Sequence, residues 1–156
     1  GSAVGEFTFR LARVASHVTA IEADDFAYRI AEALRLYKDI DNISFRRTSA
    51  QNFMAKCESS YEICLCINVH MWIEKQLGKE KTIELFRRFS QNVRHLYFQT
   101  AHKESGGMYL VEYLKNAEDI AQYLLDCGFR CVEQVSTTCV HGGERILFYC
   151  QGNWEI

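Results

Sequence analysis

The chain has 156 residues, of which 48% are hydrophobic and 24% are charged, and its formal net charge at pH 7 is −2. That length and hydrophobic content are enough for one globular domain with a full core, and they exclude a disordered chain. The near-neutral charge gives no electrostatic footprint for nucleic acid or for an anionic membrane. We therefore expect a single domain over residues 1–156 that has no nucleic-acid partner.

The first 24 residues predict a glycine loop, a short helix and a strand that follow one another without spare residues. Gly1 and Gly5 bracket a tight turn, and Phe7 begins an apolar repeat at helical spacing. Alternating apolar residues then predict a strand that ends at Glu22, where a carboxylate can hold a ribose diol. In a doubly wound fold such a loop follows the first, central strand, so we expect a fragment that lacks this strand. The stretch predicts half of a nucleotide-type cofactor site.

The rest of the chain alternates predicted helices and strands. The helix over 24–38 is capped by Asp24 or Asp25, and we expect its buried face to consist of Phe26, Ile30, Ala33, Leu34 and Tyr37. Further helices are predicted over 78–91 and 117–125, and strands over 43–45, 61–68, 93–100, 129–135 and 144–150. This order predicts an α/β fold with a mostly parallel sheet and an antiparallel C-terminal edge hairpin.

Polar and aromatic side chains follow the predicted strand over 61–68. Asn68 stands where an apolar strand should continue, and either cofactor contact or a loop cap explains it. His70 titrates near neutral pH and is predicted either as a general base or as a partly buried structural residue. Trp72 is predicted as a wall for cofactor or substrate, or as ordinary core packing.

Two further groups of residues indicate where a substrate could bind and in which cellular compartment the protein works. His102 and Glu104 belong to a predicted polar loop after the strand over 93–100. We expect either that they contact a substrate or that the loop is simply exposed to solvent. The seven cysteines form an odd set without zinc-type spacing, which favours reduced thiols in a cytoplasmic protein over disulfides or a metal site. The longest apolar run is too short to span a membrane.

In the order of these motifs the sequence resembles the class I S-adenosylmethionine (SAM)-dependent methyltransferases over essentially the whole chain. Residues 1–7 look like the family's glycine loop, and residues 21–24 match the second-strand end whose carboxylate holds the cofactor ribose. Residues 48–51 occupy the place of an Asp-Ala pair that faces the adenine, with Ser49 at the aspartate position. Residues 66–72 resemble the fourth-strand exit beside the methyl donor, and residues 129–150 resemble the closing antiparallel pair.

The resemblance implies a three-layer Rossmann-like fold, SAM as the cofactor, and a set of site residues. The cofactor-binding residues would lie in the glycine loop and at the strand ends: Gly1, Ser2, Ala3, Gly5, Phe7, Glu22, Ala23, Ser49, Ala50, Asn68 and Val69. In such a site His70 would be catalytic, while Trp72, His102 and Glu104 would contact the substrate.

Three functions follow as hypotheses. The first is a SAM-dependent methyltransferase that acts on a small molecule or a glycan at oxygen, since the proline-free chain has no Asn-Pro-Pro-Tyr motif for amide or base-amine methylation. Fusion to another domain in a longer chain is compatible with this hypothesis. The alternative is a catalytically silent methyltransferase-like module of a larger protein, which the missing first strand and Ser49 favour. A nicotinamide-binding domain requires a G-x-G-x-x-G spacing that the residues from Gly1 to Gly5 do not match.

Overall fold

The structure, a computed structural model, describes residues 1–101, 111–140 and 143–154. The chain divides into two compact units, Gly1–Phe53 and Met54–Ile156. The prediction of a single domain over 1–156 stays a prediction.

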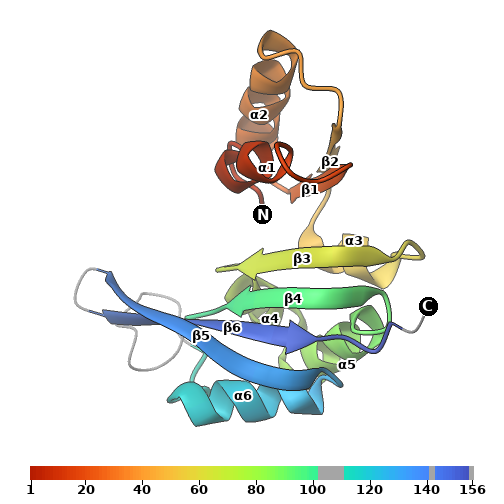
Figure 1. The fold of residues 1–156 in the computed structure, drawn as a ribbon. Helices are drawn as coiled ribbons and strands as arrows, with labels where there is room; N and C mark the ends of the chain where they lie inside the picture. Colours follow the sequence, from red (N-terminus) through yellow and green to blue (C-terminus); the bar gives the residue numbers. More distant parts are fainter. Residues whose placement is uncertain (102–110, 141–142, 155–156) are drawn as a thin grey trace. The chain divides into compact units, whose positions relative to one another are not determined.

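The first unit is built on a pair of parallel strands. Strand β1 (Val18–Glu22) pairs with β2 (Ile43–Arg47), and Glu22 lies opposite Arg47 in the register. Helix α1 (Glu6–Leu11) precedes β1, and α2 (Asp25–Tyr37) connects β1 to β2 (Figure 1). The predicted strand end at Glu22 and both predicted helices are confirmed. The core of this unit consists of Ala20, Ala31, Ile43 and Phe45, with Phe9 packed against them.

Helix α2 turns a different face to the core than the sequence predicts. Ala31 is fully buried, whereas Phe26 is 74% exposed and Tyr37 is 88% exposed. Ala33 is exposed as well, so the prediction that Phe26, Ala33 and Tyr37 lie on the buried face is wrong. The helix carries two apolar faces, and the one with the small side chain of Ala31 is the one packed against the core of the unit.

The second unit holds a four-stranded sheet in the order β3-β4-β6-β5 (Figure 1). Strands β3 (Tyr61–Ile67) and β4 (Val93–Gln99) are parallel. Strand β6 (Gly143–Gln151) is antiparallel to β4 and to the edge strand β5 (Arg130–Val140). The α/β class and the antiparallel C-terminal pair are confirmed, although both strands are longer than predicted. The three-layer architecture stays a prediction.

Helices pack against this sheet through large apolar side chains. Phe86 of α5 (Lys79–Phe89) and Phe98 of β4 are fully buried, and their ring centroids lie 6.0 Å apart. Helix α6 (Ala117–Asp126) begins at the predicted cap, Asn116, which accepts a hydrogen bond from the backbone N–H of Asp119. Helices α3 (Ala50–Ala55) and α4 (His70–Leu77) were not predicted. Of the described helices, none has the length and apolar character that a membrane span requires.

The end of β6 is fixed by a glycine that has no room for a side chain. A Cβ atom on Gly152 would lie 1.6 Å from the carbonyl oxygen of Val93. The Gly152 N–H donates to the carbonyl of Arg94 at 2.9 Å, and the Asn153 N–H donates to that of Ser90 at 2.8 Å. The backbone after β6 therefore lies directly against the start of β4.

Candidate functional site

Glu22 connects the glycine loop to the start of α2. Its side chain is almost fully buried, and Oε2 accepts a hydrogen bond from the Ala3 N–H at 2.6 Å. The other carboxylate oxygen, Oε1, accepts from the Asp24 N–H at 2.9 Å. A Cβ atom on Gly1 would lie only 2.9 Å from Oε2, so the loop approaches the carboxylate as closely as a glycine allows. The structure thus brings together three predicted site residues: Gly1, Ala3 and Glu22.

The glycine loop itself is held by backbone hydrogen bonds. The Ser2 N–H donates to the carbonyl of Ile21 in β1 at 2.8 Å, and the Gly5 N–H donates to the carbonyl of Ser2 at 2.9 Å. Gly5 has φ +90°, a left-handed conformation that favours glycine. The Ser2 hydroxyl is buried and has no hydrogen-bond partner among the residues that the structure describes. A buried polar atom of this kind usually finds a partner, so this hydroxyl is a candidate ligand contact.

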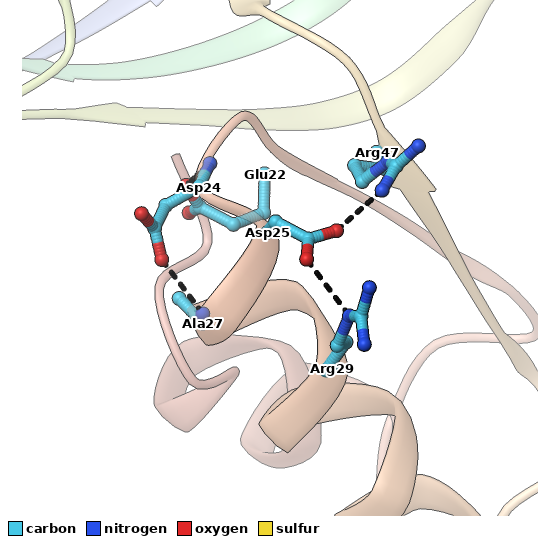
Figure 2. A network of polar contacts seen from close by, with 6 residues as sticks. All are labelled: Glu22, Asp24, Asp25, Ala27, Arg29 and Arg47. Atoms are coloured by element: carbon cyan, nitrogen blue, oxygen red, sulfur yellow. Dashed lines mark hydrogen bonds and ion pairs between the residues drawn. The ribbon is translucent and has the colours of Figure 1, made fainter.

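Two aspartates organise the start of α2 beside Glu22, as Figure 2 shows. Asp24 caps the helix, because its carboxylate accepts a hydrogen bond from the Ala27 N–H at 2.8 Å. Asp25 forms ion pairs with Arg29, at 2.8 Å, and with Arg47 at the end of β2. The hydrogen bond from Arg47 lowers the pKa of Asp25. The carboxyl ends of β1 and β2 are therefore tied to the same helix terminus.

The remaining cofactor-binding residues predicted in this unit are Phe7, Ala23, Ser49 and Ala50. Phe7 lies on α1 with its side chain 56% exposed, and Ala23 is exposed. The Ser49 hydroxyl accepts a hydrogen bond from the Asn52 N–H at 3.3 Å and so caps α3, whose first residue is Ala50. Ser49 therefore already has a structural function in the helix that follows β2.

In the second unit, Asn68 and Val69 form the short connection between β3 and α4. Asn68 is exposed and has φ +56°, a conformation that asparagine adopts more readily than most residues, and its N–H donates to the carbonyl of Gln99 at 2.8 Å. Val69 is half-buried, and Trp72 in the first turn of α4 is 43% exposed. His102 and Glu104 lie outside the described residues.

His70 lies in the core of the second unit, which corrects its prediction as the general base. It is fully buried, and both ring nitrogens are engaged: Nδ1 lies 3.1 Å from Thr100 Oγ1 and Nε2 lies 2.7 Å from Tyr123 Oη. Burial lowers the pKa of His70 to about 3. An imidazole with no exposed surface cannot reach an acceptor, and a pKa this low makes it a weak base. His70 is therefore a structural residue in this fold.

One polar pair near His70 was not predicted from the sequence. The Tyr113 hydroxyl donates to Glu74 Oε2 at 2.5 Å, and Lys79 Nζ lies 4.3 Å from the centroid of the Tyr113 ring. Desolvation raises the pKa of the half-buried Glu74 carboxyl. Glu74 stands four residues after His70 on α4, so a prediction of that helix would have placed both on one face.

Comparisons with known proteins give the class of fold. No family sequence model matches the chain, and no curated protein matches it by sequence. A crystal structure of WbdD matches with a TM-score of 0.84 at 15% identity, over 98% of this chain and 34% of that chain. A second structure of the same protein, described as a bifunctional kinase-methyltransferase, gives the same TM-score.

Two other solved structures match almost as much of the chain. Magnesium protoporphyrin IX methyltransferase from Synechocystis PCC 6803, with bound SAM, has a TM-score of 0.71 at 17% identity over 97% of this chain and 67% of that chain. The N-terminal domain of EvdMO1 with SAH bound has a TM-score of 0.70 at 13% identity over 97% of this chain and 72% of that chain. The chain thus has the fold of the SAM-dependent methyltransferases, and it spans about a third of the length of WbdD.

Proposed function

We propose that the chain is the core of a three-layer, SAM-dependent methyltransferase domain that transfers a methyl group to an oxygen atom of a small molecule or glycan in the cytoplasm. The observation that carries the proposal is the Glu22 carboxylate, which is held at the end of β1 by the Ala3 and Asp24 N–H groups at 2.6 and 2.9 Å. Two of the structures that share the fold are described as binding SAM or SAH. Because the chain spans about a third of WbdD, fusion to another domain belongs to the same proposal.

The residues of the glycine loop fit such a cofactor. Carboxylate oxygens accept hydrogen bonds from a ribose diol, and each oxygen of Glu22 has acceptor capacity beyond its one backbone donor. The buried Ser2 hydroxyl has no partner among the described residues, so a polar group of a ligand would satisfy it. A Cβ atom on Gly1 would lie 2.9 Å from Oε2 of Glu22, so a side chain at this position would crowd the carboxylate.

Methyl transfer to a hydroxyl oxygen requires binding of both substrates, their orientation, and removal of the hydroxyl proton. Bound SAM supplies an electrophilic methyl group on its sulfonium. The chain's own residues would hold the cofactor and orient an acceptor towards it, which accounts for a large part of the rate enhancement in such transfers. With His70 excluded as the base, Trp72 and Asn68 stay predictions for substrate and cofactor contact.

Calorimetric titration and thermal unfolding with SAM and SAH test the cofactor. A ligand at 100 times its dissociation constant adds about 2.7 kcal/mol to the free energy of unfolding. We expect stabilisation of the wild-type chain, its loss in Glu22→Ala, and its retention in Asp41→Ala, which removes an exposed carboxylate of the same unit. A chain that is stabilised by neither ligand would contradict the proposal.

The acceptor is tested separately, with SAM labelled on its methyl group. Transfer of the label to hydroxyl-bearing small molecules or glycans, and not to amines, is the expected outcome. Transfer only to amines would leave the enzyme class intact and refute the oxygen acceptor.

A second candidate is a methyltransferase-like module without activity. It is favoured by Ser49, which stands at the position of an adenine-contacting aspartate and whose hydroxyl is used to cap α3. Such a module would bind SAH or SAM weakly and transfer no label to any acceptor.

A further inference from the structure

The Glu22 carboxylate takes one of its hydrogen bonds from backbone at the start of α2. The Asp24 N–H donates to Glu22 Oε1 at 2.9 Å, and Asp24 is itself the N-cap of the helix. The position of this donor therefore depends on where the first turn of α2 lies relative to the end of β1. Because the Glu22 side chain is buried, it has little freedom to follow a donor that moves.

A side chain from the neighbouring strand holds that first turn in place. Arg47 is the last residue of β2 and the register partner of Glu22, and it donates a hydrogen bond to the carboxylate of Asp25 (Figure 2). Asp25 is the first residue of α2. Beside this contact, the Thr48 N–H donates to the Glu22 carbonyl at 3.0 Å. The end of β2 therefore holds both the backbone of Glu22 and the helix start that supplies its donor.

We propose that Arg47 is a positioning residue for the cofactor. It fixes the start of α2 through Asp25, and the Asp24 N–H in turn orients the Glu22 carboxylate. The orientation of a carboxylate sets the directions in which its remaining lone pairs accept hydrogen bonds, here from the two hydroxyls of a ribose. The inference rests on the proposed function, because it takes Glu22 as the group that holds the cofactor ribose. It assigns no contact between Arg47 and the cofactor.

Arg29 provides a comparison within the same network, because it pairs with the same carboxylate from inside the helix. Its Nε lies 2.8 Å from Asp25 Oδ2, and the two residues are four positions apart on α2. An ion pair at this spacing supports the helix itself. The pair between Asp25 and Arg47 spans 22 residues and connects the helix to β2. Loss of either arginine removes the same charge, but only the loss of Arg47 removes this connection.

The exposure of the pair sets the size of the expected effect. The side chains of Arg47 and Asp25 are 58% and 47% exposed. Exposed ion pairs change an equilibrium constant by about fivefold at most, and salt screens them. We therefore expect loss of the pair to weaken cofactor binding about three- to fivefold at low ionic strength, and less at about 1 M salt.

Calorimetric titration with SAH tests the proposal. Arg47→Met should raise the SAH dissociation constant about three- to fivefold, and Arg47→Lys, which keeps a positive charge, should recover part of the loss. Arg29→Met is the matched control and should leave the constant unchanged. An Arg47→Met variant that binds SAH as the wild type does overturns the positioning role alone. A wild-type chain that binds neither SAH nor SAM refutes the proposed function, and the positioning role with it.

Amide hydrogen exchange, followed by NMR without any ligand, tests the route through the helix start. Arg47→Met should accelerate exchange of the Asp24 amide, which donates to Glu22, several-fold. The Val18 amide donates to the carbonyl of Asn42 at the other end of β1 and is the internal reference, whose exchange should stay unchanged. Equal acceleration of both amides overturns the proposal, because Arg47 then acts only on the stability of the whole unit. An unchanged Asp24 amide overturns it as well.

Discussion

The carboxylate of Glu22 lies 2.6 Å from the backbone nitrogen of Ala3, nineteen residues earlier in the chain. This hydrogen bond fastens the glycine loop to the end of β1. The same side chain also accepts a hydrogen bond from the Asp24 N–H at 2.9 Å, so it connects three pieces of backbone: the glycine loop, the end of β1 and the start of α2.

Replacement of Glu22 by Ala should accordingly destabilise the protein as well as weaken cofactor binding. Two N–H groups lose their acceptor, and we expect the free energy of unfolding to fall by about 1–3 kcal/mol. Urea unfolding followed by far-UV circular dichroism measures the change. Glu22→Gln keeps one carbonyl oxygen as an acceptor and should lose less. Equal stability of Glu22→Ala and the wild type would show that the loop is held by other contacts.

The buried His70 gives a prediction for the pH dependence of stability. Burial lowers its pKa to about 3, whereas the unfolded chain has the ordinary value near 6.5. Below pH 6.5 the unfolded state therefore binds a proton that the native state does not bind. The stabilisation from this group is complete above about pH 6.5 and is lost progressively as the pH falls towards 3.

The change should amount to about 2–3 kcal/mol between pH 6.5 and pH 4.5. Urea unfolding of the wild type and of His70→Gln over this range isolates it from the carboxyl groups that titrate in both proteins. We expect a shallower pH dependence in the variant. Parallel curves would mean that His70 gains its proton equally well in the folded state.

Gly5 should resist a side chain for two reasons. Its φ of 90° and ψ of 19° are a left-handed conformation, which costs an alanine about 1 kcal/mol. A Cβ atom on Gly5 would also lie 2.9 Å from the Phe9 ring, which would have to move. We therefore expect Gly5→Ala to lower the free energy of unfolding by about 2–3 kcal/mol, measured by urea unfolding followed by circular dichroism. A loss of only about 1 kcal/mol would mean that the ring moves freely.

Gly152 should tolerate no side chain at all. An added Cβ atom would overlap the carbonyl oxygen of Val93 at 1.6 Å, and both partners are backbone that cannot rotate away. We expect Gly152→Ala to destabilise the second unit by about 3 kcal/mol or more. Loss of the cooperative thermal transition, monitored by tryptophan fluorescence, is the measurement. A melting temperature within a few degrees of the wild-type value would contradict this packing.

Most of the helices and strands could be predicted from local sequence patterns. The strand that ends at Glu22 is visible because apolar residues alternate up to a single carboxylate, and the cap at Asn116 is visible because a polar residue precedes an apolar helical repeat. Helix α4 has no such signal. Its first turn follows Asn68 and Val69 directly, and neither side chain caps it.

Tertiary contacts explain what could not be predicted. His70 has the chemistry of a catalytic base, and only its partners Thr100 and Tyr123, 30 and 53 residues away, make it a core residue. In α2 both faces are apolar, so periodicity alone could not decide whether Ala31 or Phe26 points inward. Glu22 was placed correctly because its position at a strand end depends on the local sequence only.

The division of the chain into two units also decides which spectroscopic signals report on which part. Both tryptophans, Trp72 and Trp154, and all seven cysteines belong to Met54–Ile156. Fluorescence and thiol labelling therefore follow the unfolding of that unit alone. The unit that holds Glu22 has only Tyr28 and Tyr37 as near-ultraviolet reporters besides phenylalanine, so it can unfold without a change in either signal.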